Sequence, residues 1–350
     1  MRKTILIILF QLSFIMVKSY SQSNSNSLIY LTKYTFTKEQ KDVGYIKIRS
    51  GSNAQIKKIA IEQDFSKAFK ITKDNKLLIR KKVIKQDTKW IDIVLNVETS
   101  EGHEKDTFRI VNDQFIHNKV IAHRGAWKNT GATENSVASL NHAIAIGCEG
   151  SEFDVHMASD SVLFIHHNPD VEGVSIAKST SVVISQIKLS NGEALPTLTD
   201  YLTAGTRQNK TKLILEIKMS ELGKESSIAL THKVVELVEK LHAEAWVDYI
   251  SFDYDVCKEV MKIAPYAKVA YLNGDIAPAA LAQSNFYGFD YHFSVLQKNA
   301  GWIKEAKQNK LTVNVWTVND KAMMKELLQK NVDFITTNEP ELLLKLTSGK

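Results

Sequence analysis

Apolar and polar positions alternate in the first third of the chain, and the pattern changes after residue 117. From about residue 27 to residue 112, short runs such as "YIKIRS", "NKLLIRKKV" and "WIDIVLNVE" alternate apolar with polar side chains. A period of two residues is typical of strands that bury one face. Turn-forming stretches such as "SGSN", "KDNK" and "SEGHE" separate the runs. The pattern therefore predicts a small all-β sandwich of about seven antiparallel strands.

After residue 117, short apolar runs alternate with amphipathic stretches of helical spacing. The apolar runs are "KVIAHRG", "GSEFDVHM", "LILEIKM", "DYISFD", "KVAYLN", "YGFDYHF", "TVNVWTV" and "DFITTN". Stretches such as "SVASLNHAIAIG" and "SSIALTHKVVELVEKLHAE" lie between them and bury one side of a helix. Eight strand and helix units in about 230 residues predict an α/β fold, a (β/α)8 TIM barrel that follows the sandwich.

The first 22 residues have the order of a secretory signal. Arg2 and Lys3 precede an apolar stretch over residues 5–17, and the small residues Ser19 and Ser21 follow. That stretch is short for a helix that spans a bilayer, although an uncleaved anchor is the alternative. We therefore expect export to the periplasm or the extracellular space. The expected divisions are a signal peptide over 1–21, a sandwich domain over 23–116 and a barrel domain over 117–350.

Charge and cysteine content add to this picture. Residues 23–116 hold 18 Lys and Arg against 12 Asp and Glu, whereas residues 117–350 hold 24 against 27. A basic sandwich could contact a membrane or an anionic polymer, or its lysines could simply be solvated. No recognisable basic and aromatic motif supports binding to nucleic acid.

With so few cysteines, Cys148 and Cys257 are predicted to be buried free thiols.

Polar side chains collect where the predicted barrel strands end. They are His123 and Arg124, Glu152 and Asp154, Glu216 and Lys218, and Trp316 and Asn319. Barrel enzymes carry their chemistry at this end of the strands. Glu152 and Asp154 lie two residues apart and so face the same side of a strand, where Glu216 could complete a site for a hard divalent cation. Salt bridges to barrel lysines are the alternative.

Two histidines end apolar runs near these carboxylates. His123 follows "VIA", and the run "SVLFIHHNPD" ends in His166 and His167, of which alternation directs only one toward the site. Two imidazole rings beside a divalent cation suit the cleavage of a phosphate ester, because one ring removes a proton while the other donates one.

Seven segments in this order resemble the glycerophosphodiester phosphodiesterase family, which uses a (β/α)8 barrel. They are "AHRG", "TENS" (133–136), "EFDVHMASDSVLFIHHN" (152–168), "LPTL" (195–198), "LEIK" (215–218), "VWTVN" (315–319) and "DFITTNEP" (333–340). Together they cover about residues 118–348. The sandwich is more loosely similar to cadherin-like and other immunoglobulin-type modules, and it lacks the acidic calcium motifs of true cadherins.

The resemblance implies a role for each matching residue. His123 and His167, rather than His166, match the catalytic pair. The implied ligands of one cation, Ca2+ or Mg2+, are Glu152, Asp154 and Glu216. The implied substrate-binding residues are Arg124 and Lys218 for the phosphate, the Glu-Asn pair Glu134 and Asn135, and Trp316 in the glycerol pocket. The chain departs from the family at Asn168 and Asn338, where the family usually has Asp.

The implied activity is metal-dependent hydrolysis of a glycerophosphodiester to sn-glycerol 3-phosphate and an alcohol. Two alternatives stay open. One is phospholipase D-like or phosphoinositide head-group cleavage at a membrane, to which the basic sandwich would dock. The other is a non-catalytic module that binds a glycerophosphate-containing polymer.

Overall fold

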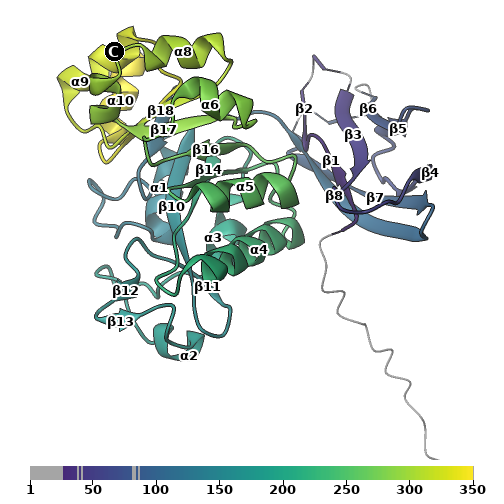
Figure 1. Cartoon of the computed structure of the whole chain (residues 1–350), viewed down its shortest axis with the longest axis horizontal. Coiled ribbons are helices and arrows are strands. Elements are labelled where there is room, and N and C mark those ends of the chain that lie inside the picture. Colours follow the sequence, from purple (N-terminus) through teal and green to yellow (C-terminus); the bar gives the residue numbers. More distant parts are fainter. Residues whose placement is uncertain (1–26, 38, 41, 81–83, 86, 350) are drawn as a thin grey trace, which may run out of the picture.

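The computed structural model describes residues 27–37, 39–40, 42–80, 84–85 and 87–349, arranged as a β domain beside a barrel (Figure 1). The predicted signal peptide over residues 1–21 lies outside the described residues. Among the helices in the described ranges, none is both long enough and apolar enough to cross a membrane.

The β domain consists of two four-stranded sheets. One sheet has the order β1 (Ile29–Leu31), β3 (Asp42–Ile48), β6 (Lys76–Ile79) and β5 (Phe69–Ile71). The other has the order β2 (Thr35–Phe36), β8 (His103–Asn112), β7 (Trp90–Thr99) and β4 (Ile56–Gln63). Alternate residues of β7 are buried, as the period of two predicts. The all-β prediction is confirmed, but the described residues form eight strands, and β2 pairs parallel to β8. The likeness to cadherin-like modules stays a prediction.

Eight parallel strands close the barrel. They are β9 (Val120–Ala122), β10 (Gly150–Met157), β14 (Lys212–Ile217), β15 (Val247–Ser251), β16 (Val269–Tyr271), β17 (Gly288–His292), β18 (Thr312–Trp316) and β19 (Phe334–Thr337). Closure is complete because β9 pairs with both β10 and β19. Each strand overlaps one of the eight predicted apolar runs, so the (β/α)8 prediction is confirmed.

Helices cover the outside of the strands. They are α1 (Val137–Ala145), α3 (Leu198–Gly205), α4 (Lys224–Lys240), α5 (Tyr254–Ile263), α6 (Pro278–Gln283), α7 (Phe293–Lys298), α8 (Trp302–Gln308), α9 (Lys321–Gln329) and α10 (Pro340–Thr347). In α5 the side chain of Asp253 caps the first turn, and Val256, Cys257 and Val260 face the core. Cys148 and Cys257 are both buried and free, as predicted.

The chain leaves the barrel after β10 to form a small excursion, which lies at the lower end of the molecule in Figure 1. It contains β11 (Leu163–Ile165), β12 (Asp170–Val171), β13 (Val174–Ser175) and α2 (Ser181–Ile184). Phe164, Ile176 and Ile184 are among the residues of its separate apolar core. Since β11 pairs antiparallel to β10, the excursion carries His167 back toward the carboxyl ends of the barrel strands.

The two domains meet at the opposite end of the barrel, where its strands begin. A guanidinium nitrogen of Arg49 lies 2.6 Å from a carboxylate oxygen of Glu239, at the end of α4. The Tyr266 hydroxyl donates to the same oxygen at 2.7 Å, and its ring lies edge-on to that of Tyr34, with centroids 4.9 Å apart. The β domain therefore packs against the barrel end that lies away from the predicted site.

Candidate active site

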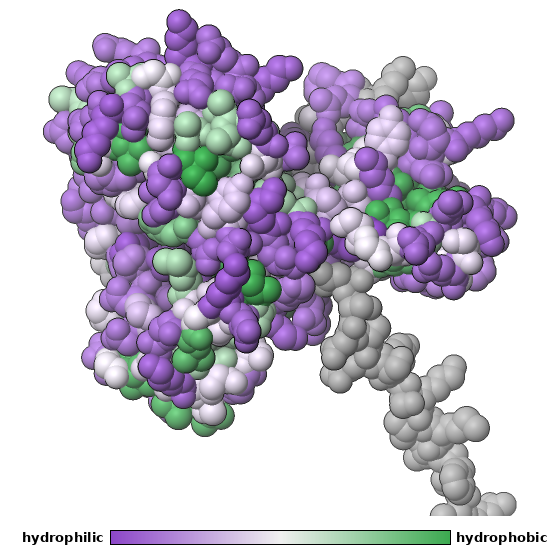
Figure 2. All heavy atoms as spheres, viewed as in Figure 1, coloured by the Kyte–Doolittle hydropathy of each residue, from purple (hydrophilic) through white to green (hydrophobic). Residues whose placement is uncertain are grey.

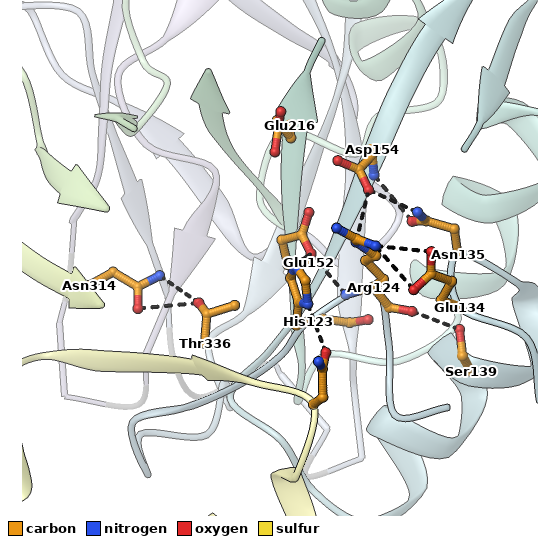
Figure 3. Close-up of polar contacts among 12 residues, drawn as sticks. His123, Arg124, Glu134, Asn135, Ser139, Glu152, Asp154, Glu216, Asn314 and Thr336 are labelled. Atoms are coloured by element: carbon orange, nitrogen blue, oxygen red, sulfur yellow. Dashed lines mark hydrogen bonds and ion pairs between the residues drawn. The ribbon is translucent and has the colours of Figure 1, made fainter. Parts of the chain in front are cut away.

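Three carboxylates converge at the carboxyl ends of neighbouring barrel strands (Figure 3). Glu152 and Asp154 lie on β10, and the register of β10 with β14 places Asp154 opposite Glu216. One oxygen of each residue lies within 4.8 Å of the others, and all three side chains are buried. Carboxylate oxygens at this spacing are suited to a hard divalent cation.

The electrostatics of the three carboxylates also fit a cation. Burial, followed by the charges of Asp154 and Glu216, raises the pKa of Glu152 well above its ordinary value. Burial and Asp154 raise the pKa of Glu216 to about 7. Burial acts to raise the pKa of Asp154 as well, but the charge of Lys218 and a hydrogen bond from Asn135 outweigh it, so the pKa of Asp154 is lowered overall. A divalent cation would relieve the repulsion that remains among these groups.

Two basic residues already contact these carboxylates. Lys218 Nζ lies 2.7 Å from Glu216 Oε1 and 3.2 Å from Asp154 Oδ1. Arg124 Nη1 donates to both carboxylate oxygens of Glu134 at 2.9 and 3.1 Å, and its Nε lies 3.7 Å from Asp154 Oδ2. The salt bridges considered as the alternative are thus present beside the convergent carboxylates. Arg124 Nε has no hydrogen-bond partner within the described part of the chain, which leaves a donor at the site.

Asn135 is buried against Asp154. Its amide nitrogen donates to Asp154 Oδ2 at 2.8 Å, and its amide oxygen accepts from the Asp154 backbone N–H at 3.2 Å. These two bonds fix the orientation of a predicted cation ligand. The structure therefore places Asn135 as a support for Asp154 and Glu134 as the partner of Arg124.

His123 is held by an asparagine that directly follows the last barrel strand. Its Nδ1 lies 2.7 Å from Asn338 Oδ1, and because an amide oxygen only accepts, Nδ1 carries the proton. The other ring nitrogen, Nε2, lies 4.0 Å from a carboxylate oxygen of Glu152. Burial, followed by the charge of Arg124, lowers the pKa of His123 to about 4. The ring is therefore neutral near pH 7, with a free lone pair on Nε2.

His167 has a matching arrangement with the asparagine that follows it. Its Nδ1 lies 3.0 Å from Asn168 Oδ1, so this ring too donates to an amide oxygen. Burial lowers its pKa, whereas the charge of Asp154 acts in the opposite direction. His167 therefore lies within electrostatic reach of the carboxylates, while the neighbouring His166 Nδ1 contacts the Asn168 backbone oxygen at 3.0 Å.

Trp316 forms an aromatic wall at the end of β18. Its ring lies edge-on to Phe252 and His292, with centroid distances of 5.5 and 5.2 Å. Its indole N–H donates to the Asp290 backbone oxygen at 2.8 Å, which fixes the ring orientation. An immobile apolar face of this kind could pack against the carbon skeleton of a small substrate.

Sequence reasoning noted Asn338 only as a departure from the family pattern. The structure places it on His123, and Asn319 Oδ1 in turn accepts from the Asn338 backbone N–H at 2.8 Å. Its position in the chain could have indicated this role. Asn338 directly follows β19 and so belongs to the same end of the barrel as the other strand ends.

Comparison with known proteins agrees with this geometry. Residues 123–342 match the model of the "Glycerophosphoryl diester phosphodiesterase family". A glycerophosphodiester phosphodiesterase from Caldanaerobacter subterraneus is 27% identical over 248 residues, which is 65% of this chain and 96% of that protein.

Solved structures give the same result. A glycerophosphodiester phosphodiesterase from Parabacteroides distasonis is 42% identical, with a TM-score of 0.65 over 66% of this chain and 97% of that one. An Oleispira antarctica phosphodiesterase, solved with its product sn-glycerol-3-phosphate, shares the fold at 21% identity and a TM-score of 0.55, over 66% of this chain and 97% of that one. The matched region holds the converging carboxylates and both histidines, and the chain belongs to the glycerophosphoryl diester phosphodiesterase family.

Proposed function

We propose that this phosphodiesterase hydrolyses glycerophosphodiesters to sn-glycerol 3-phosphate and an alcohol, with one divalent cation held by Glu152, Asp154 and Glu216. The observation that carries the proposal is the buried convergence of these carboxylates, together with two histidines that they affect electrostatically and whose Nδ1 atoms face amide oxygens. The product of the Oleispira enzyme is consistent with this substrate class. The cation would be Ca2+ or Mg2+, since both prefer oxygen ligands.

The two imidazole rings carry the protons in the proposed reaction. One ring, in its neutral form, removes the proton of a free glycerol hydroxyl, whose oxygen attacks phosphorus. The other ring enters the step as an imidazolium and gives its Nε2 proton to the departing alcohol oxygen. The resulting cyclic phosphate is opened by water as the rings exchange roles, which yields sn-glycerol 3-phosphate. The attached hydroxyl is an effective nucleophile because its capture costs little entropy.

Positive charge near the phosphoryl group would come from several sources. The bound cation would offset charge on the phosphoryl oxygens. Arg124 and Lys218, which contact the same carboxylates, could turn their donors toward phosphate oxygens, as expected of basic phosphate ligands. Trp316 would pack against the glycerol carbons.

A second candidate is cleavage of a lipid head group at a membrane surface. Met219 directly follows Lys218 and Leu222 lies three residues further on, and they are 56% and 53% exposed, so apolar side chains lie near the site. Figure 2 shows a mostly hydrophilic surface with small apolar areas, one of them over α2, where Val182 is exposed. In this proposal the exported protein would rest on lipid through these residues or through its basic β domain.

The decisive experiment is release of glycerol 3-phosphate from a panel of water-soluble glycerophosphodiesters, with added Ca2+, Mg2+ or chelator. We expect turnover that requires a cation and that disappears in Glu152→Gln. His123→Ala and His167→Ala should each lower kcat by about 10²- to 10⁴-fold. His232→Ala is the matched control, since that ring lies on the outer face of α4, where it contacts Glu259.

Each outcome separates the candidates. Near-normal kcat in either histidine variant would contradict the two-histidine assignment, and turnover in chelator would contradict the cation. Activity on dispersed lysophospholipid but not on soluble diesters would favour the membrane candidate. Binding to a glycerophosphate polymer without any turnover would identify a non-catalytic module.

A further inference from the structure

A cavity of about 520 Å³ lies where the barrel meets the β domain, at the end away from the candidate active site. Ile121, Ile214 and Asp290 line it from inside the barrel, and Tyr34 and Asp113 line it from the β-domain side. Its volume is within the range of about 300–1,000 Å³ that is usual for small-molecule sites.

The side chains inside the barrel explain the cavity. Large branched residues normally fill a barrel of this kind. Here Ile121, Ile214 and Ile250 supply apolar side chains, but β16 and β17 contribute the small Ala270 and the polar Asp290. Space therefore remains among these side chains, and it continues to residues of the β domain.

Three polar atoms in the cavity walls lack a hydrogen-bond partner among the described residues. They are Asp290 Oδ1, the Tyr249 hydroxyl and Glu244 Oε2, and all three atoms are buried. Asp290 is 2% exposed and Tyr249 is 1% exposed as whole residues. Buried polar atoms are normally paired, because an unmade hydrogen bond costs stability. A ligand that supplies hydroxyl groups would pair them.

The charges around the cavity favour a neutral ligand. Lys212 Nζ lies 2.9 Å from Asp248 Oδ1, and Lys268 lines the same wall, so an organic cation would meet two ammonium groups. The positive charge of these lysines is offset by Asp113 and Asp248, which line the same cavity, so an anion gains little net attraction. Burial, helped by the charge of Glu216, raises the pKa of Asp290 to about 8. Near pH 7 its carboxyl is therefore largely neutral and can both donate and accept, as the Tyr249 hydroxyl can.

The cavity reaches solvent between the domains. Two of the residues that line it are exposed: Tyr287 is 40% exposed, and the side chain of His117 is largely exposed. A small molecule could therefore enter without passing the candidate active site.

We propose that this inter-domain cavity binds a small neutral polyol through Asp290, Tyr249 and Glu244. The apolar wall of Ile121, Ile214 and Phe334 would pack against its carbon skeleton. The inference does not depend on the proposed function, because none of the candidate catalytic or cation-binding residues lines this cavity.

The test is calorimetric titration of the full chain with glycerol and with myo-inositol near pH 7, in chelator. We expect saturable binding of at least one polyol. Tyr249→Phe removes one oxygen and should weaken that binding roughly tenfold, the usual effect of one hydrogen bond. Ala270→Leu should fill the cavity and abolish binding, whereas Ala280→Leu, on the exposed surface of α6, should leave it unchanged.

Three results would overturn the proposal. The first is a titration in which neither polyol gives a saturable heat of binding, and the second is an unchanged affinity in both Tyr249→Phe and a folded Ala270→Leu. The third is tighter binding of tetramethylammonium than of either polyol, with release of a proton. If Ala270→Leu does not fold, the affinity of Tyr249→Phe decides. Binding that persists in His123→Ala but weakens in Tyr249→Phe would separate this cavity from the active site.

Discussion

Two asparagine side chains orient the two candidate catalytic imidazoles. His123 faces Asn338 Oδ1 at 2.7 Å, and His167 faces Asn168 Oδ1 at 3.0 Å. Each amide oxygen accepts from Nδ1–H, which leaves Nε2 as the ring atom that takes up or releases the proton in the proposed reaction. Because the amides are neutral, they orient the rings without the stabilisation that a carboxylate gives to an imidazolium. The replacement of Asp by Asn in these motifs is therefore compatible with ring orientation.

Loss of the Asn338 amide should impair turnover without removing substrate binding. We expect Asn338→Ala to lower kcat about 10- to 100-fold with little change in KM, because His123 loses the partner that holds its ring. Asn338→Asp should recover orientation, and its added negative charge should raise the pKa of His123 and move the acidic limb of the kcat profile to higher pH. Steady-state kinetics over a range of pH measures both effects.

Asn309→Ala is the control for this pair, since the Asn309 side chain donates to the Glu305 backbone oxygen at the end of α8. Full kcat in Asn338→Ala would show that the amide does not position the ring.

The buried His156 should make the protein less stable in mild acid. Burial lowers its pKa to about 4 from an ordinary value of 6.5. Between these values the unfolded chain binds a proton that the folded chain does not, so the free energy of unfolding falls as pH decreases. We expect this residue to contribute a loss of about 2 kcal/mol between pH 7 and pH 5. Urea unfolding at both pH values measures it.

His156→Gln keeps a donor for the His167 backbone oxygen but cannot take up the proton, so its loss of stability over this range should be smaller. The same substitution at the exposed His232 should leave the pH dependence unchanged. Equal pH dependence in His156→Gln and the native chain would contradict the assignment.

At the scale of elements, β17 and β18 approach so closely that only glycine fits at one position. A Cβ atom on Gly288 would lie 2.1 Å from Thr312 Oγ1 and 2.4 Å from the Thr312 backbone oxygen. The backbone contact cannot be relieved by a change of rotamer. We expect Gly288→Ala to lower the free energy of unfolding by about 1–3 kcal/mol, as overpacking does. Denaturant unfolding gives the value.

Gly301→Ala is a matched control at the start of α8, because no atom lies within 4 Å of its added Cβ and its φ of −78° suits any residue. It should change stability by no more than about 0.5 kcal/mol. A similar effect for both substitutions would mean that the strands separate to accommodate a methyl group.

At the scale of the whole molecule, a buried ion pair joins the two domains. Arg49 contacts Glu239 at 2.6 Å, and both side chains are largely buried. Arg49→Ala would leave Glu239 without its cationic partner, which typically costs about 3–5 kcal/mol for a buried pair. We expect the thermal transition to move to lower temperature and the β domain to unfold before the barrel. Differential scanning calorimetry resolves the transitions.

Lys105→Ala is the control, because Lys105 pairs with Glu62 on the exposed surface of the β domain. Exposed pairs contribute about 0–1 kcal/mol. If Arg49→Ala and Lys105→Ala have equal effects, the inter-domain pair does not link the domains.

The predicted elements agree with the structure because their signals are local. A strand that is buried in a barrel appears in the sequence as a short apolar run. All eight barrel strands could therefore be assigned from the sequence. Position at a strand end likewise singled out Glu152, Asp154 and Glu216, which the structure brings within 4.8 Å. The pairing of β2 with β8 was missed, because two residues of strand are too few to show a period.

By itself, the sequence determined the order of strands and helices, the change from sandwich to barrel, and the residues that end each strand. Periodicity encodes which face of an element is buried, and this is enough to select the architecture. Tertiary structure decided which strand ends meet. Asn338 reaches His123, 215 residues away, because β19 closes the barrel against β9. Contacts of this kind, like the Arg49 pair and the inter-domain cavity, depend on barrel closure and domain packing, which no local pattern specifies.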